Sequence, residues 1–278
     1  VLEPTFSPRA TEYVPAMIKQ IKSLVDNKNA YLDAHGHVMF DVESFANYGA
    51  LSRRNLDEMK AGSRVAINDS KRNPMDFVLW KPSDDNLPGW KSPWGRGRPG
   101  WHIECSAMIE ELLGTEFDIH GGGIDLVFPH HENEVAQSTC IHPKGKFADF
   151  WMHNGFVTIE GEKMSKSANN FFTVRDLQEK GLDGETIRMV LMSTHYRQPL
   201  DWTNEKVQTV SNSLKRWRQS CIGHVEQPAV DKSVLEALSD DLNTPLALTE
   251  LHRLAASRDF SALLGSARFL GLLSNLDQ

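Results

Sequence analysis

Three side chains of the kinds that bind transition metals stand close together in the sequence. His130 and Glu134 are four residues apart, so on a helix both project from one face, and Cys105 comes earlier, at the start of another expected helix. A thiolate, an imidazole and a carboxylate are all zinc ligands, and a tetrahedral zinc site takes one more. His and Glu at this spacing also occur as surface or capping pairs. Neither Cys140 nor Cys221 is suitably spaced for the fourth position, which leaves water, a substrate or a residue absent from this chain.

A second candidate site is the run Gly-Glu-Lys-Met-Ser-Lys-Ser at 161–167. Lys163 and Lys166 are three residues apart, and ammonium groups on a short loop can hold a polyphosphate as compact, flexible positive charges. Gly161 and the Asn169-Asn170 pair suit a loop that changes shape. A solvated basic turn is the alternative that this spacing alone leaves open.

A third candidate is the run His-Gly-Gly-Gly at 120–123, which follows a predicted strand. Open α/β sheets bind ligands at the carboxyl ends of their strands. Glycines such as Gly122 let a nucleotide approach the backbone closely, and Asp125 could accept hydrogen bonds from ribose hydroxyls. Trp101 could supply a stacking face or pack in the core. The glycines alone are equally consistent with an ordinary loop.

The segment His35-Gly36-His37 is interpreted as a turn. It lacks the residue that would make it His-x-Gly-His, a signature of nucleotidyl-transferring α/β enzymes, and it lies in a polar stretch between two expected strands. We assign no chemistry to it.

The first part of the chain mixes one clear helix with short strands. Apolar residues at steps of three and four predict an amphipathic helix over 11–28. Two short strands, at 30–32 and 38–42, flank the turn, and residues 52–64 predict another helix. The stretch 82–99, rich in Pro, Gly and Trp, is expected to be an ordered but irregular connection.

The candidate metal ligands lie in a segment that reads as α/β. A helix is expected from 100–105 through 113, a buried strand at 117–119, a helix from Pro129 onward and a strand at 156–159. Strand, glycine turn, helix and strand in succession fit part of a parallel α/β sheet.

Downstream of this segment the pattern becomes helical. Thr173 and Asp176 form a capping box for one helix, and Asn243 with Pro245 marks the start of another. We expect a helical bundle built from helices at 204–222, 232–239, 244–257 and 259–275.

The bulk composition is that of a globular protein. The 278 residues carry a net charge of −7, which argues against nonspecific nucleic-acid contacts over the whole surface but not against a local basic groove. No apolar run is long enough to span a bilayer, and no signal peptide is visible. Three scattered cysteines favour free thiols in a reducing, cytoplasmic setting. The absence of an initiator Met suggests a processed or truncated chain.

Taken together, these segments resemble cysteinyl-tRNA synthetases of the bacterial type, which belong to class I. The matching text is Gly-Arg-Pro-Gly-Trp-His-Ile-Glu-Cys-Ser-Ala-Met at 97–108, the stretch 117–125, Phe-Pro-His-His-Glu-Asn-Glu at 128–134, Trp-Met-His at 151–153 and Lys-Met-Ser-Lys-Ser at 163–167. Weaker resemblance extends to 8–12, 76–81 and 240–245, so it covers nearly the whole chain.

The resemblance implies a fold and a division into domains. The fold is α/β: the second half of the Rossmann-type parallel sheet of a class I synthetase, with an inserted connective region, followed by an α-helical bundle. The implied segments are a connective region at 1–95, the second Rossmann half at 96–160, the lysine loop and stem-contact region at 161–203, and the helical bundle at 204–278. The first Rossmann half is expected before Val1 and an anticodon-binding module after the last residue.

The resemblance also implies an activity: ATP-dependent activation of cysteine to cysteinyl-adenylate, followed by transfer to tRNA-Cys. Carried over residue by residue, Cys105, His130 and Glu134 match zinc (Zn2+) ligands, and Lys163 and Lys166 match catalytic lysines that stabilise the pyrophosphate side of ATP bound with Mg2+. Four further residues match positions lining the cysteine and adenosine pockets: His120, Trp101, Asp125 and Gly122. The implied protein is a cytoplasmic monomer without membrane contacts.

Two other functions remain open at the level of sequence. A ligase that joins cysteine to an amino-sugar in mycothiol synthesis shares the zinc and lysine motifs, although the stretch 161–172 and the helical tail are closer to the tRNA enzyme. A non-catalytic, synthetase-derived binding module is the other alternative. Because the first Rossmann half is expected upstream, we predict that the 278-residue chain alone forms no cysteinyl-adenylate.

Overall fold

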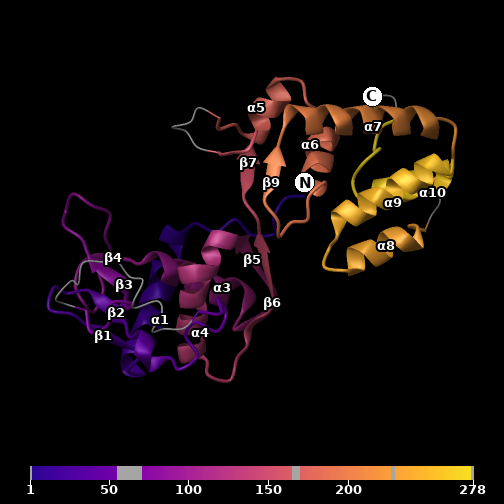
Figure 1. Ribbon diagram of the computed structural model, residues 1–278. Helices are drawn as coiled ribbons and strands as arrows, with labels where there is room; N and C mark the ends of the chain where they lie inside the picture. The colour runs from indigo at the N-terminus through magenta and orange to yellow at the C-terminus, as the bar shows by residue number, and fades with distance from the viewer. Residues whose placement is uncertain (1, 55–70, 165–169, 227–228, 277–278) are drawn as a thin grey trace. The chain divides into compact units, whose positions relative to one another are not determined.

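Two hydrophobic cores that share no residue divide the chain. In the computed structural model, unit 1 is Val1–His153 and unit 2 is Asn154–Gln278. The structure describes residues 2–54, 71–164, 170–226 and 229–276, and Figure 1 labels most of the helices and strands within them. The four-segment division drawn from the sequence stays a prediction, and each unit is described by itself.

Unit 1 begins with the amphipathic helix that the sequence predicts. A 3-10 helix, Ala10–Glu12, leads into α1, Val14–Asp26, whose buried side chains recur every three or four residues. The strands β1, Ala30–Leu32, and β2, Val38–Phe40, pair antiparallel as expected. Between them the Asp33 carboxylate accepts hydrogen bonds from the backbone N–H groups of His35 and His37, each at 2.8 Å, so this segment is the predicted turn.

Two strands that the sequence pattern did not predict complete this sheet. The strands β3, Phe77–Pro82, and β4, Gly97–Pro99, extend it antiparallel in the order β1-β2-β3-β4. A 3-10 helix, Val42–Ser44, follows β2. The stretch 82–99 is therefore a connection with a strand at each end. The helix predicted at 52–64 falls largely outside the described residues.

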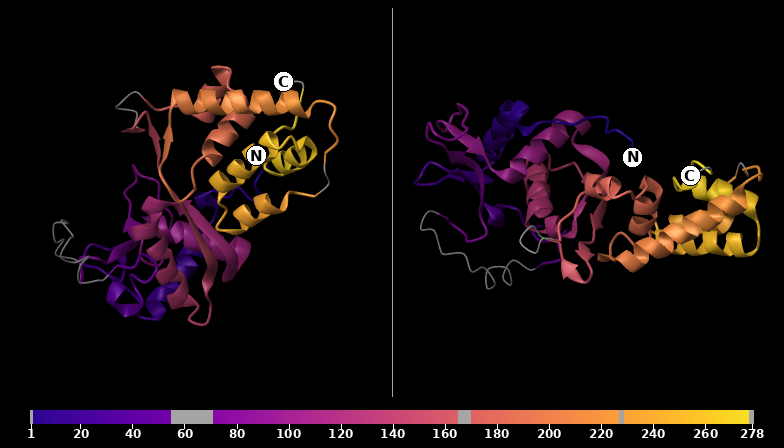
Figure 2. Two further views of the ribbon diagram at one scale, coloured as in Figure 1. Left: turned by 45° about the vertical axis from the view of Figure 1, so that its right-hand side comes forward. Right: turned by 90° about the horizontal axis from the view of Figure 1, so that it is seen from above.

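The rest of unit 1 carries the candidate metal ligands. It consists of α3 (Trp101–Leu113), β5 (Glu116–Gly123), a 3-10 helix (Ile124–Leu126), a five-residue π-type turn (Val127–His131), α4 (Glu132–Ile141) and β6 (Phe147–Asn154). The strands β5 and β6 pair with each other, and α1, α3 and α4 pack together, as the two views of Figure 2 show.

One expectation for this segment is corrected, because the glycine run at 120–123 continues β5 instead of forming a turn after it. The helix expected from Pro129 is present: His130 and His131 lie in the π-type turn, which contains the cis Phe128–Pro129 peptide bond and leads directly into α4. The strand β6 was missed, since the strand predicted in this part of the sequence was the later one at 156–159.

Unit 2 opens with a three-stranded sheet. The strand β7, Val157–Ile159, pairs parallel with β9, Leu200–Trp202, and antiparallel with β8, Glu162–Lys163. Two helices intervene: α5, Val174–Glu179, and α6, Gly184–Met192. The predicted capping box is present, because the Thr173 hydroxyl accepts a bond from the Asp176 N–H and the Asp176 carboxylate accepts one from the Thr173 N–H. The pattern did not predict α6 or β9.

Four helices complete unit 2, as predicted. They are α7 (Asn204–Cys221), α8 (Lys232–Ser239), α9 (Thr244–Ala256) and α10 (Phe260–Phe269). The Asn243 side chain caps α9 by accepting a bond from the Leu246 N–H at 3.1 Å. The last helix ends at Phe269, before the predicted 275, close to Gly271 with φ +72°. Within the described part of the chain, no helix has the length and apolar character that spanning a membrane requires.

Candidate metal centre

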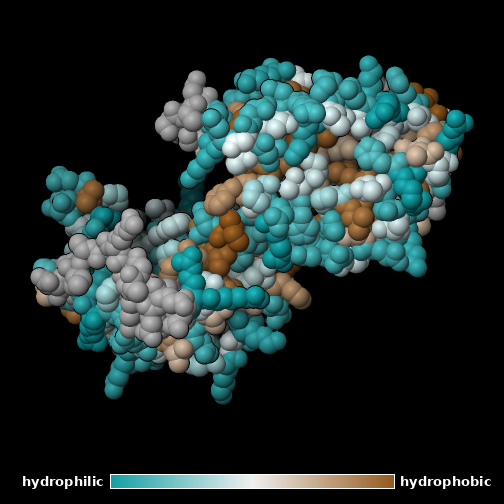
Figure 3. All heavy atoms as spheres, in the orientation of Figure 1, coloured by the Kyte–Doolittle hydropathy of each residue, from teal (hydrophilic) through white to brown (hydrophobic). Residues whose placement is uncertain are grey.

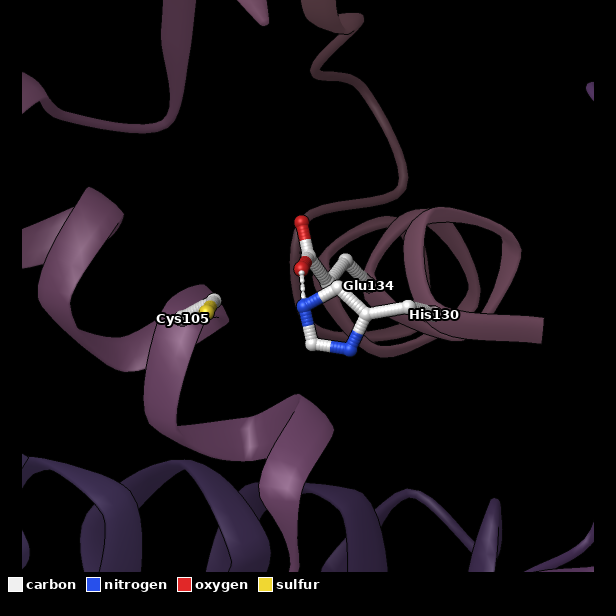
Figure 4. A group of neighbouring side chains, drawn as sticks. All are labelled: Cys105, His130 and Glu134. Atoms are coloured by element: carbon white, nitrogen blue, oxygen red, sulfur yellow. Dashed lines mark ion pairs between the residues drawn. The ribbon is translucent and has the colours of Figure 1, made fainter. Parts of the chain in front are cut away.

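The three predicted metal ligands come together in unit 1. One ligand atom each from Cys105, His130 and Glu134 lies within 4.8 Å of the other two. Figure 4 draws the three side chains, with the ion pair between His130 and Glu134 dashed. The His130 Nε2 atom is 2.6 Å from Glu134 Oε1. His130 and Glu134 are buried and Cys105 is half-buried, so the cluster is largely withdrawn from water.

A close backbone contact fixes where Cys105 lies. The helix α3 starts directly after Gly100, whose N–H donates to the Leu79 carbonyl of β3 at 2.8 Å. A Cβ atom at Gly100 would be 2.0 Å from the Val78 carbonyl oxygen, so only glycine allows the helix to begin this close to the sheet. Cys105 follows within the first turns of that helix and thereby reaches His130.

A second donor set shares the same carboxylate. His120, His131 and Glu134 also offer ligand atoms within 4.8 Å of one another, and His120 Nε2 lies 3.1 Å from Glu134 Oε2. His120 was predicted to line the substrate pocket. His131 was not singled out from the sequence. Glu134 therefore lies between the imidazoles of His120 and His130.

Burial and hydrogen bonding act in opposite directions on Glu134. Burial by itself raises the pKa of this carboxyl group, but the bonds from His120 and His130 outweigh it and lower the pKa to about 2. Burial, with the Glu134 and Glu104 charges, raises the pKa of the Cys105 thiol to about 12. In the protein without a metal the cluster thus holds a carboxylate and a neutral thiol.

Burial favours the neutral form of two imidazoles around the cluster, those of His102 and His131. Burial lowers the pKa of His102 and of His131 to about 4 in each case. The Nδ1 atoms of His102 and His130 are 2.7 Å apart, and His131 Nδ1 is 2.8 Å from His153 Nε2. Neutral imidazole is the form that ligates metals, and a second partner fixes the ring orientation.

The donor set opens into an apolar pocket of about 440 Å3. Its polar lining includes Cys105, His120, His130 and Glu134. The apolar wall is formed by Phe6, Pro8, Met108, Ile109, Leu112 and Leu113. The cluster is thus accessible to a small molecule through a mainly apolar cavity.

The residues fit a soft or borderline divalent cation. In the part of the chain that the structure describes, the buried Glu134 oxygens have no donor other than imidazole nitrogens and the Cys105 thiol. A carboxylate, a thiol and an imidazole converging in this way are a zinc-type donor set. Zinc itself stays a proposal.

Gly122 also makes room for a neighbouring side chain, and its predicted part in ATP binding stays a prediction. A Cβ atom there would lie 2.8 Å from Cε1 of His131, so the missing side chain makes room for that ring. Asp125 lies in the 3-10 helix after β5 and is exposed. Trp101 is 58% exposed although its ring centroid is 4.2 Å from that of His130, so one part of the indole stays open to a ligand.

The two lysines belong to unit 2. Lys163 ends β8 with an exposed side chain, and its carbonyl oxygen accepts a bond from the Asn170 amide at 3.2 Å. Lys166 lies outside the described residues. The role of both lysines stays a prediction.

Sequence reasoning missed part of the histidine cluster. His102 and His153 each contact a histidine of the site, and Trp151 lies 4.8 Å from His120 between ring centroids. Trp151 and His153 are two residues apart on β6 and so point to the same face. The two-residue spacing of Trp151 and His153 could have placed both on one face, but only if the strand β6 had been predicted first.

Comparison with known families assigns most of the chain to two family models. Residues 1–212 match the family described as tRNA synthetases class I (C) catalytic domain, and residues 233–273 match the DALR domain. The chain belongs to the class I (C) tRNA synthetases. This class I (C) synthetase chain therefore has the α/β fold and the helical C-terminal region that the sequence predicts.

The relatives agree with that assignment. The chain is 58% identical over 275 residues to a cysteine–tRNA ligase of Cereibacter sphaeroides, covering 99% of the chain and 56% of the relative. It is 58% identical over 271 residues to one of Paracoccus denitrificans, covering 98% of the chain and 58% of the relative. The class I (C) synthetase chain thus spans little more than half the length of these relatives.

Solved structures show the same fold at low sequence identity. A methionyl-tRNA synthetase of Mycobacterium tuberculosis in complex with methionyl-adenylate superposes with a TM-score of 0.62 at 13% identity, covering 96% of this chain and 72% of that one. A putative arginyl-tRNA synthetase of Campylobacter jejuni gives 0.57 at 11%, covering 99% and 65%. At these identities the likeness concerns the fold alone.

Proposed function

We propose that this chain is part of a cysteine–tRNA ligase, which activates cysteine with ATP and transfers it to tRNA-Cys. The observation that carries the proposal is the buried cluster of Cys105, His130 and Glu134 in the lining of an apolar pocket. It occurs in a class I (C) synthetase chain whose relatives described above are named cysteine–tRNA ligases.

The donor cluster would hold Zn2+. Bound there, this metal supplies a preference for sulfur ligands, which favours the thiol of cysteine over the hydroxyl of serine. Glu134 brings the negative charge to the site, and the ring of His130 is oriented by His102. His120 contacts Glu134 on its other oxygen and lines the pocket that cysteine would enter.

The remaining residues of the pocket would position the two substrates. The open part of the Trp101 indole offers a face to the amino acid, and the exposed Asp125 carboxylate can accept hydrogen bonds from the ribose hydroxyls of ATP. The backbone at Gly122, which carries no side chain, leaves room for the nucleotide as well as for His131.

The chemistry proposed is two successive transfers. The cysteine carboxylate attacks the α-phosphorus of ATP, a P–O bond forms, and pyrophosphate with its Mg2+ leaves. A hydroxyl at the 3′ end of tRNA then attacks the carbonyl of the adenylate, and AMP leaves. Lys163 and Lys166 would offset the charge on the pyrophosphate by electrostatic positioning, without a covalent bond to the enzyme.

The metal site can be tested apart from activity. We expect Cys105→Ser to lower the zinc content of the purified chain well below one equivalent, because it removes the soft ligand. Cys140→Ser is the matched control, since Cys140 is also half-buried but lies outside the donor cluster. Metal content by inductively coupled plasma mass spectrometry checks this. Equal zinc in Cys105→Ser and the parent would remove Cys105 as a ligand.

Selection of cysteine has its own readout. In the cobalt-substituted chain, L-cysteine is expected to produce a new sulfur-to-cobalt charge-transfer band, whereas L-serine is not. The same spectra for Cys105→Ser separate the contribution of the protein thiol from that of the ligand. Identical spectra with cysteine and serine would contradict thiol recognition at this site.

The two halves of the proposed reaction can be measured separately. Binding of labelled tRNA-Cys, against a tRNA of another specificity, tests the RNA partner and separates this function from cysteine–amino-sugar ligation. Cysteine-dependent ATP–pyrophosphate exchange tests adenylate formation. A protein containing this chain that gives no cysteine-dependent exchange would contradict the proposed activation step.

A further inference from the structure

One buried carboxylate of unit 1 is not explained by the donor cluster. Figure 3 shows that hydrophilic residues predominate on the face that it draws, and in the described part of the chain only four Asp, Glu, Lys or Arg residues are buried: Asp76, Glu132, Glu134 and Arg218. Glu134 contacts the imidazoles of the cluster, and Arg218 pairs with Glu185. Glu132 is 0% exposed, and none of the ion pairs among the described residues includes it. A carboxylate buried in this way is costly unless hydrogen bonds hold it.

Two backbone amides hold the Glu132 carboxylate. Its Oε1 atom accepts a bond from the Gly49 N–H at 2.9 Å, and its Oε2 atom accepts one from the Ser52 N–H at 2.8 Å. Glu132 is also the first residue of α4, where the N–H groups of the first turn favour a negative charge. The carboxylate is thus stabilised without a cation, and it fastens the segment 48–52 to the start of α4.

The segment 48–52 makes two further contacts with the same part of the chain. Tyr48 is buried, and its hydroxyl donates to the side-chain oxygen of Asn133. The Tyr48 ring lies edge-on to that of Phe128, with 6.4 Å between the ring centroids. Phe128 lies in the π-type turn that also carries His130. The segment therefore packs against the turn that positions a candidate metal ligand.

Glu132 projects away from the donor cluster. It stands between His130 and Glu134, two residues from each. Two residues correspond to about 200° around a helix axis, so Glu132 lies on the side opposite to this pair. His130 Nε2 and Glu134 Oε1 are 2.6 Å apart on their own side. Within the described residues, neither donor set includes Glu132 or a residue of the segment 48–52. One side of this part of the chain thus carries donors, and Glu132 holds the other.

We infer that Glu132 is a positioning residue for the candidate metal centre. By binding the segment 48–52, its carboxylate fixes the backbone of the turn from one side, and this fixes the direction of the His130 ring on the other side. The inference rests on the proposed function, which supplies the metal. Groups that orient a metal ligand without touching the metal change metal affinity by about 10–100-fold when they are removed.

The experiment measures Co2+ binding by the full chain, with the visible d–d absorption of the metal as the readout. Glu132→Gln keeps the size of the side chain but turns one oxygen into an NH2 group, which then opposes a backbone N–H and breaks one of the two bonds. We expect the Co2+ dissociation constant to rise about tenfold. The absorption maximum should also shift, because the His130 ring is no longer held in one direction.

A second variant weakens the same contact through a different residue. Tyr48→Phe removes the hydroxyl that binds Asn133 and keeps the ring against Phe128. It should weaken Co2+ binding in the same direction as Glu132→Gln, but by less. The double variant should lose less affinity than the product of the two single losses, because both substitutions act through one segment. If Glu132→Gln does not fold, Tyr48→Phe decides the question.

Two controls match the loss of charge and the loss of stability. Glu110→Gln removes a carboxylate of α3 that contacts Gln20 and His142 and belongs to neither donor set. Leu24→Ala weakens the core of unit 1, in which Leu24 is fully buried. Both variants should retain the parent absorption spectrum and dissociation constant, since neither residue takes part in the bonds that hold the segment 48–52.

The possible results separate this inference from the proposed metal site. Parent-like Co2+ binding and absorption in Glu132→Gln, or in Tyr48→Phe where Glu132→Gln does not fold, overturns the inference and leaves the metal site standing. An equal change in Glu110→Gln or Leu24→Ala also overturns it, because the effect would then follow charge or stability. A parent chain that binds no Co2+ overturns the proposed metal site and this inference together.

Discussion

At the scale of single residues, the candidate metal site depends on two glycines as much as on the donor residues. Gly100 lets α3 start against β3, and Gly122 leaves space for the His131 ring. The candidate donor residues were predictable, because a four-residue spacing and a short motif are local in sequence. The packing of His131 against Gly122 was not predictable, because it depends on a ring from another segment.

Gly122→Ala is expected to destabilise the chain by about 1–3 kcal/mol, because a new Cβ would lie 2.8 Å from His131 Cε1 in a packed region. Urea denaturation measures the change, and the His131 ring resonances in an NMR spectrum should shift. Gly121→Ala is the control: the nearest atom, the Met152 carbonyl oxygen, would be at 3.4 Å, so little loss is expected. Equal destabilisation by both substitutions would contradict this role for Gly122.

At the scale of elements, local signals succeeded where an element is long or capped. The helices α1 and α7 and the caps at Thr173 and Asn243 agree with the expectations from pattern and capping chemistry. The strands β3, β6 and β9 were missed. Each is defined by pairing with a distant segment, as β9 is with β7, and that pairing leaves little trace in a short stretch of sequence.

The start of α6 is expected to make unit 2 sensitive to acid. Burial acts to raise the pKa of Glu185, but bonds from Ser274, Arg218 and the Leu273 N–H lower it overall. A carboxyl group with a lowered pKa contributes stability that is complete above its unfolded pKa of about 4.3 and is lost as the pH falls through the folded pKa. The free energy of unfolding should therefore decrease from about pH 5 downward.

Urea denaturation of Glu185→Gln between pH 7 and pH 3 tests this account. The variant should be less stable than the parent at pH 7, and the difference should shrink as the pH falls, because the parent then loses the same charge. Glu179→Gln, at an exposed carboxylate of α5, is the control and should stay close to the parent throughout. A difference that is constant with pH would rule out the charge of Glu185 as the cause.

At the scale of the whole molecule, the two separate cores predict two unfolding transitions. Leu24 and Leu251 are both fully buried, the first in the core of unit 1 and the second in the core of unit 2. Replacing either by Ala should cost about 2–5 kcal/mol, and each substitution should lower a different transition in differential scanning calorimetry. A single transition that both substitutions lower equally would contradict independent unfolding of the two units.

The sequence by itself determined the kinds of chemistry available: Cys105, His130 and Glu134 as metal donors, the lysine run, the helical C-terminal part and the resemblance to one synthetase family. Only the tertiary structure decided which groups meet. It brings His120, His130 and His131 around the Glu134 carboxylate, with His102 against His130 and His153 against His131. The reason is that spacing fixes the face of a helix on which a residue lies, whereas contacts between distant segments depend on how helices and strands pack.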